Sequence, residues 1–306
     1  MKLSALIDPW ITDFRAQSRV NSRHSEDAYR YALQCLVDDT GDTDVAAVTK
    51  AQVKRTLARW PRAVTRRARH AAITSFFDWA MEEDHCPTSP ARQVPKVRTK
   101  KHGINRLTHP EIVALLDAAE PVRRDRWAIN LLLYTGARNA ELRGLTARDL
   151  AREGWVRLHG KGDKERWVPV VPELAPVVAE ILTLVEPEGF VLPGLRNADP
   201  PYNTRQFDSK QMLSSSSLRR QVMRVGDRAG IALHLHPHLL RHAYADAIVR
   251  FAGARVAQTL LGHESIETTV GTYTAAASLD ELAASTTGFG FRSQSLPVKT
   301  TEGDVR

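Results

Sequence analysis

The sequence lacks the features that mark extracellular and membrane proteins. Only two of its 306 residues are cysteine, Cys35 and Cys86, which gives no disulfide framework and indicates a reducing compartment. It has no run of eighteen apolar residues, and Asp8 and Pro9 interrupt the N-terminal MKLSALIDPW before a signal sequence could form. We therefore expect a cytoplasmic protein without a membrane span.

Common motifs for nucleotide and metal cofactors are also missing. The phosphate-loop pattern GxxxxGK[ST] is absent. Four histidines crowd one short stretch, and two of them have the i, i+4 spacing of helical zinc ligands: His234, His236, His238 and His242. However, no glutamate follows His238 as a zincin motif requires, and both cysteines lie far upstream. We expect neither a metal nor another cofactor.

Acidic residues are absent from one long stretch of this basic chain. Its 43 Lys and Arg exceed its 35 Asp and Glu, for a net charge of +8. Between Lys50 and Phe77 every charged side chain is basic, whereas a solvated helix face normally mixes signs. Three of these residues fall at helical spacing, and we predict that they contact DNA phosphates from the face opposite a set of small apolar residues. The basic residues are Arg62, Arg66 and Arg69, and the apolar ones Val64, Ala68, Ala71 and Ala72.

Hydrophobic periodicity divides the chain into two domains. Residues 1–90 predict four amphipathic helices, the second capped by Ser25 and the third opened by a capping box of Thr49 and Gln52. Residues 91–105 form a proline-containing linker. Its basic side chains suit the DNA backbone, although a solvated hinge without contacts is the simpler alternative; they include Lys96, Arg98, Lys100 and Lys101.

The second domain, residues 106–290, has a mixed pattern. A capping box of Thr108 and Glu111 opens it, and a later helix ends at Gly136. Alternation over 155–159 and 165–169 predicts a β-hairpin, followed by an apolar helix over 172–185. Residues 189–214 read as a loop, and Ser216 or Ser217 should cap a helix that stops at Gly230. With a flexible tail over 291–306, the expected fold is mainly α with a small β component.

Residues suited to phosphate chemistry gather near the end of this domain. His238 and Arg241 lie one helical turn apart, His263 follows in a Leu-Gly-His turn, and Tyr273 comes ten residues later. Taken singly, each is more often a packing or surface residue. Together, imidazoles, a permanently charged guanidinium and a phenol suit an anionic substrate and an oxygen nucleophile, which indicates phosphoryl transfer.

The order of these motifs resembles the catalytic half of the tyrosine recombinases, also called phage integrases. The matching segments are TGARNAEL with Arg138 and Glu141, GKGDKER with Lys161, HPHLLRH with His238 and Arg241, LGH with His263, and finally Tyr273. Residues 1–90 resemble the core-binding domain of that family in pattern only. The step of ten residues from His263 to Tyr273 is one longer than in many relatives.

The resemblance implies a role for each matched residue. Arg138, Arg241 and His263 would bind the scissile phosphate, and Glu141 would support them. Tyr273 would attack phosphorus after His238 accepts its proton. Lys161 would protonate the leaving 5′ oxygen, with Lys164 as a rival for that role.

By the same resemblance, the protein is a short, two-domain recombinase without an arm-binding domain. It would integrate or excise a phage or mobile element at attachment or crossover sites in double-stranded DNA. Resolution of plasmid or chromosome dimers is the alternative, followed by a type IB topoisomerase or a non-catalytic DNA-binding regulator. The resemblance leaves open whether directionality or bending factors take part.

The resemblance also implies a homo-tetramer on DNA. Ser278 and Glu281 form a capping box for a short C-terminal helix that includes Leu279 and Leu282. Relatives pass such a segment to the next subunit, and Phe289 and Phe291 would be further anchors. Docking of the helix on its own domain is nearly as well supported by the residues alone.

Overall fold

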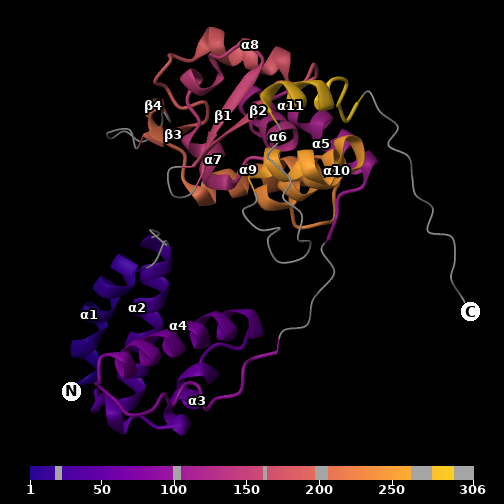
Figure 1. The fold of residues 1–306 in the computed structure, drawn as a ribbon. Helices are drawn as coiled ribbons and strands as arrows, with labels where there is room; N and C mark the ends of the chain where they lie inside the picture. The colour runs from indigo at the N-terminus through magenta and orange to yellow at the C-terminus, as the bar shows by residue number, and fades with distance from the viewer. Residues whose placement is uncertain (18–22, 99–104, 161–163, 197–205, 263–277, 293–306) are drawn as a thin grey trace, which may run out of the picture. The chain divides into compact units, whose positions relative to one another are not determined.

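The structure is a computed structural model that describes residues 1–17, 23–98, 105–160, 164–196, 206–262 and 278–292. The chain forms two compact units, residues 1–103 and 104–306 (Figure 1). Its elements confirm the predicted class, mainly α with a small β component. Within the described residues, every helix is too short or too polar to cross a membrane.

The N-terminal unit consists of helices packed around an aromatic core. They are α1 (Leu3–Gln17), α2 (Arg23–Thr40), the short 3-10 helix η1 (Val45–Ala47), α3 (Lys50–Ala58) and α4 (Ala63–Glu82). The buried Trp10 ring lies 5.6 Å from that of Phe76, edge to face. The predicted Thr49–Gln52 capping box is present at the start of α3. Ser25 is not a cap, because α2 already includes Arg23.

The basic face predicted on α4 differs from the observed one. Val64 is 70 % exposed, and of the four small apolar residues expected on the opposite face only Ala72 is buried. The core face of α4 instead includes Ile73, Phe76 and Phe77, which are fully buried. Packing of these larger side chains sets the rotation of the helix, because they bury far more apolar surface than alanines do.

The second unit surrounds a larger apolar core. Its first part contains α5 (His109–Ala119), α6 (Arg123–Thr135), α7 (Asn139–Gly144), the 3-10 helix η2 (Ala147–Leu150), β1 (Trp155–His159), β2 (Glu165–Pro169) and α8 (Ala175–Leu184). Its second part contains β3 (Pro193–Arg196), β4 (Gln206–Met212), α9 (Ser215–Arg228), α10 (Pro237–Leu261) and α11 (Leu279–Thr286). The Thr108–Glu111 capping box, the end of α6 at Gly136 and the left-handed Gly230 after α9 are as predicted.

The predicted hairpin is present as strands β1 and β2. They pair antiparallel, with Val156 opposite Val168, and both valines are buried. Side chains alternate between the two faces of a strand, so these valines fix which face of the hairpin meets the core. The tip of the hairpin, residues 161–163, lies outside the described residues.

Two local predictions for this unit were wrong. The segment read as a loop over 189–214 contains the paired strands β3 and β4. Long-range backbone bonds from Phe190 to the Ser209 carbonyl and from Val191 to the Leu145 carbonyl support this arrangement, and side-chain periodicity does not report such bonds. Helix α9 is capped by Ser214, whose hydroxyl accepts from the Ser217 N–H, rather than by Ser216 or Ser217.

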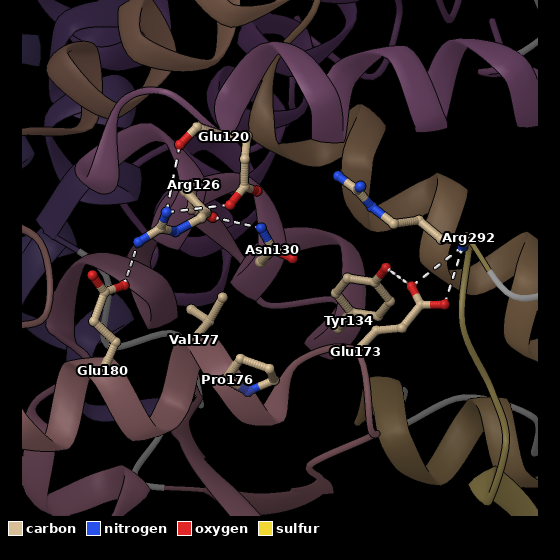
Figure 2. A pocket seen from close by; sticks show the side chains of 9 residues that line it. All are labelled: Glu120, Arg126, Asn130, Tyr134, Glu173, Pro176, Val177, Glu180 and Arg292. Atoms are coloured by element: carbon tan, nitrogen blue, oxygen red, sulfur yellow. Dashed lines mark hydrogen bonds and ion pairs between the residues drawn. The ribbon is translucent and has the colours of Figure 1, made fainter.

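The segment after α11 is part of the core of its own unit. Phe289 and Phe291 are 2 % and 0 % exposed, and the ring of Phe291 lies 5.4 Å from that of Tyr134. The Glu173 carboxylate accepts the Tyr134 hydroxyl and the backbone N–H groups of Phe291 and Arg292. Figure 2 shows Glu173 between Tyr134 and Arg292, and these three residues are among those that line a cavity of about 490 Å³. The predicted anchors are therefore buried against their own domain.

Substitution of Phe291 by alanine is expected to destabilise this unit. Loss of a fully buried phenylalanine ring removes apolar burial and leaves a cavity, at a cost of about 3–5 kcal/mol in free energy of unfolding. Urea unfolding followed by circular dichroism measures the change. Leu184→Ala is the matched control, because Leu184 is 52 % exposed at the end of α8. Equal stability of the two variants would show that the segment does not belong to the core.

Candidate active site

The predicted pair of Arg138 and Glu141 lies at the start of α7. Gly136 ends α6 in the left-handed conformation (φ 59°), and the chain turns so that Arg138 becomes the N-cap residue of α7. The Glu141 carboxylate accepts the Arg138 backbone N–H at 2.7 Å and its guanidinium Nη1 at 2.7 Å. Glu141 is buried, with a side chain 2 % exposed, whereas that of Arg138 is 42 % exposed. This is more than a surface ion pair.

A third residue of this site, Arg166 on β2, was not assigned from the sequence. Its Nη1 and Nη2 donate to the two Glu141 carboxylate oxygens at 2.6 and 2.8 Å, and its Nε donates to the Leu260 carbonyl at 2.8 Å. One signal could have found it. Arg166 shares the parity of the buried Val168, and a charged side chain on the inner face of a strand requires a partner.

Arg241 reaches the same place from α10. Its side chain is 4 % exposed and donates to the carbonyls of Gly136 and Leu261, the latter at 2.7 Å. Its Nη1 lies 4.0 Å from Glu141 Oε2. Burial, followed by the nearby positive charges of Arg138 and Arg166, lowers the pKa of Arg241 to about 10. The group therefore remains a cation at neutral pH.

Three guanidinium groups thus meet the C-terminal turn of α10. Arg166, Arg241 and Arg138 donate to the consecutive carbonyls of Leu260, Leu261 and Gly262. The end of a helix carries partial negative charge and unpaired carbonyl groups, so cations are favoured there. The next residue, His263, lies outside the described residues.

The resulting cluster is cationic around an ionised acid. Burial by itself would raise the pKa of Glu141, but its bonds to Arg166 and then to Arg138 outweigh burial and hold this pKa below its usual range. Three permanent positive charges against one negative charge leave an excess of positive charge. Because Arg138 is open to solvent, the cluster can bind an anion.

Histidines line the first turn of α10. His236 caps the helix by accepting the Leu239 N–H at its Nδ1, 3.1 Å away. The rings of His238 and His242 meet edge to face at 4.4 Å. The His238 side chain is exposed in part, but its ring has lost some of its solvent. This partial desolvation, followed by the neighbouring His242 and Arg241, lowers the pKa of His238. His238 is therefore neutral at neutral pH and can accept a proton.

The described residues contain no group of three or more His, Cys, Asp or Glu side chains arranged to hold a metal ion. Within the histidine-rich stretch, His234 instead contacts Arg219, with 2.9 Å between its Nε2 and the guanidinium Nη2.

Several predicted site residues lie outside the described part of the chain: Lys161, His263, Tyr273, Lys100 and Lys101. The rival Lys164 lies at the foot of β2, where its carbonyl accepts the Gly160 N–H at 2.6 Å. Lys96 and Arg98 lie within the described part of the chain, and both are exposed.

The three arginines predicted to bind DNA from α4 have different surroundings. Arg62 precedes the helix and is exposed. Arg66 donates to the carbonyls of Trp60 and Pro61, and Arg69 donates to the Ala28 carbonyl. The Arg69 guanidinium also lies over the Tyr31 and Trp60 rings, at 5.4 and 5.8 Å. Arg66 and Arg69 therefore hold elements of their own unit together.

Histidine NMR should reveal the lowered pKa of His238. Its ring should titrate below the ordinary value of about 6.5. His242→Gln removes the neighbouring ring that can become charged, so it should raise the His238 midpoint. The midpoint should stay below the ordinary value, because the loss of solvent around the ring is the larger cause of the lowered pKa. Between the lowered pKa and about 6.5 the unfolded chain binds the extra proton, so His238 should make stability rise with pH in that window. An unchanged or lower midpoint in the variant would contradict this account.

Comparison with known proteins places this arrangement in a family. The profile of the phage integrase family matches residues 105–279. Tyrosine recombinase XerD of Shewanella oneidensis is 32 % identical over 272 residues, which cover 86 % of this chain and 87 % of that protein. Tyrosine recombinase XerC of Serratia marcescens is 30 % identical, with 78 % of each chain covered.

Solved structures share the fold at low sequence identity. A lambda integrase (75–356) dimer bound to a COC′ core site matches with a TM-score of 0.69 at 18 % identity, covering 90 % of this chain and 99 % of that one. A lambda integrase tetramer bound to a Holliday junction also matches with a TM-score of 0.69, covering 89 % and 80 %. With the profile match over more than half of its length and relatives at 30 % identity or more, the chain belongs to the phage integrase family of tyrosine recombinases.

Proposed function

We propose that this protein cleaves and rejoins DNA at specific sites through a 3′-phosphotyrosine intermediate. The observation that carries the proposal is the cationic cluster on Glu141, in which Arg138 faces solvent and Arg241 lies buried beside it. A phosphodiester gains negative charge as its phosphorus becomes pentavalent. Fixed positive charges around that group stabilise the transition state more than the ground state.

The arginines contribute in different ways to this stabilisation. Arg138 can donate directly to a non-bridging phosphate oxygen, because much of its guanidinium is exposed. Arg241 is already bound to two carbonyls, so much of its contribution is charge in a site of low polarity. His263, which directly follows the C-cap residue of α10, would add a further hydrogen-bond donor to the phosphate.

Tyr273 would be the nucleophile and His238 its base. An ordinary tyrosine has a pKa of about 10, so its attack on phosphorus requires help with the proton. A neutral His238 beside the arginines is suited to take it. Attack would form the phosphotyrosine bond and release a 5′ hydroxyl. Attack by a second 5′ hydroxyl would then release Tyr273 and join the new strands.

Tyr273→Phe should bind DNA normally and form no covalent adduct. Phenylalanine lacks the oxygen that would bond to phosphorus, while the cationic cluster is unchanged. A denaturing gel of protein incubated with nicked substrate DNA measures the adduct. Tyr31→Phe, in the N-terminal unit, is the control and should still form it. An adduct in the Tyr273 variant would refute the assignment.

Substitution of the leaving oxygen should separate Lys161 from Lys164 as the acid. A 5′ sulfur leaves without protonation, so a variant that lacks only the acid should recover on a sulfur-containing substrate. We expect Lys161→Ala to be slow on the oxygen substrate and to recover with sulfur, as seen in single-turnover cleavage. Recovery of Lys164→Ala instead would assign the acid to Lys164.

Double-stranded DNA is the proposed partner of both units. We propose phosphate contacts from Arg62 and from the basic segment that contains Lys96, Arg98, Lys100 and Lys101. Arg66 and Arg69 would contribute charge at longer range, since their guanidinium groups already bind backbone carbonyls. Binding through such contacts should weaken steeply with salt.

Assembly into a tetramer on DNA is part of the same proposal. It is supported by the shared fold with lambda integrase, for which a tetramer bound to a Holliday junction is known. In the structure, α11 and the following segment dock on their own unit. Exchange with a neighbouring copy would therefore require Phe289 and Phe291 to leave the core that contains Tyr134.

The cellular role is proposed as integration or excision of a mobile element, carried out in the cytoplasm on the nucleoid. Dimer resolution is the nearest alternative, and accessory bending or directionality factors belong to either. Incubation with genomic DNA, followed by sequencing of fragments covalently bound to the protein, tests the proposal and identifies the site. If no fragment is covalently bound, the alternative of a non-catalytic DNA-binding regulator is favoured. Relaxation of plasmids without a preferred site would indicate a topoisomerase.

A further inference from the structure

Arg166 takes the central place in the carboxylate network of Glu141. Its two Nη atoms meet the two carboxylate oxygens at 2.6 and 2.8 Å, which is the paired geometry that a planar guanidinium allows. Both side chains are nearly inaccessible, at 9 % and 2 % exposure. Arg138 makes one guanidinium bond to the same carboxylate and remains 42 % exposed.

The difference between the paired bonds of Arg166 and the one guanidinium bond of Arg138 is important, because a buried carboxylate must be neutralised. An ionised acid without a partner in the interior is costly, and a nearby cation will be drawn to it. Among the described residues, Arg138 is the other guanidinium within hydrogen-bond distance of Glu141, and Arg241 lies at 4.0 Å. Without Arg166, Arg138 would be the group best placed to turn inward.

We propose that Arg166 is a positioning residue that neutralises Glu141 and thereby leaves the Arg138 guanidinium available for the scissile phosphate. The proposal rests on the proposed function in naming phosphate as the ligand. Arg166 is itself fixed by its Nε bond to the Leu260 carbonyl. A Cβ on Gly262 would approach Arg166 Cδ to 3.2 Å, so the glycine leaves room for this side chain.

A first test needs no DNA. In a crystal structure of the full-length Arg166→Gln variant, Arg138 should pair with both Glu141 oxygens and lose most of its exposure. The double variant Glu141→Gln, Arg166→Gln removes the acid as well and should leave Arg138 exposed. An Arg138 that keeps its single bond and its exposure in Arg166→Gln would overturn the proposal.

A second test measures the charge preference of catalysis. The probes are two oligonucleotides that carry the site identified by sequencing the covalently bound DNA. One has the natural phosphate at the cleavage position, and the other has an uncharged methylphosphonate there. Arg166→Gln should cleave the phosphate about tenfold or more slowly, yet lose little on the methylphosphonate, which needs less positive charge. A general loss of packing would slow both substrates equally, and that result would overturn the proposal.

Two further variants make the comparison specific. Arg157→Gln removes an arginine from the neighbouring strand β1, where Nη2 lies 2.9 Å from the buried Asp149 carboxylate, and the ratio of the two rates should stay at its parental value. Arg166→Lys keeps the charge but not the paired geometry, so its ratio should be intermediate. A shift with Arg157→Gln as large as with Arg166→Gln would count against the assignment.

The two tests separate this inference from the proposed function. If the parent protein forms no adduct with any DNA, the proposed function fails, and the position of Arg138 in the crystal structure still decides the role of Arg166. If the parent cleaves DNA and Arg166→Gln slows both substrates alike, the proposed function stands and the inference fails.

Discussion

The second unit, residues 104–306, depends on the bonds made to the buried carboxylate of Glu141. It draws together the start of α7 through Arg138 and strand β2 through Arg166. Arg166 in turn binds the end of α10 through the Leu260 carbonyl. Burying this charge is costly unless its oxygens are fully bonded, so the three segments are held in one relative arrangement. The same bonds therefore hold the fold together and build the cationic cluster.

Close packing beside the network restricts the turn before Arg138. Gly136 has a positive φ of 59°, and a Cβ there would lie 2.4 Å from the Tyr244 ring. Its carbonyl also accepts a bond from Arg241. Glycine is required at this position for both its conformation and its size. This gives a physical reason for the glycine two positions before Arg138 in the sequence.

Features decided by neighbouring residues could be predicted from the sequence. The Thr49 and Thr108 capping boxes, the β1–β2 hairpin and the glycine end of α6 each depend on a few consecutive positions. The pairing of Arg138 with Glu141 belongs to the same class, since they lie one turn apart. For residues that are far apart in the chain, the family resemblance supplied only expected roles, and these stay predictions.

Features decided by distant contacts were not predictable in this way. The partner of Arg166 is Glu141, on another element, and periodicity reports only that its face is buried. Arg66 and Arg69 looked like free surface charge, but backbone carbonyls of their own unit bind them. The opposite error occurred at Val64, where an apolar side chain faces solvent because larger residues of α4 set its rotation.

Arg138 and Arg241, which we propose bind the scissile phosphate, differ in the contacts that they make, and this difference affects how genetic variation at the two positions would be interpreted. Arg241 joins the carbonyl of Gly136 to that of Leu261 and is almost fully buried, whereas Arg138 is largely at the surface. Variants at Arg241 would therefore lower the amount of folded protein in a cell, apart from any effect on activity. Poorly folded chains are degraded in cells. A survey of alleles would therefore compare the contributions of the two positions to activity correctly only after correction for protein abundance.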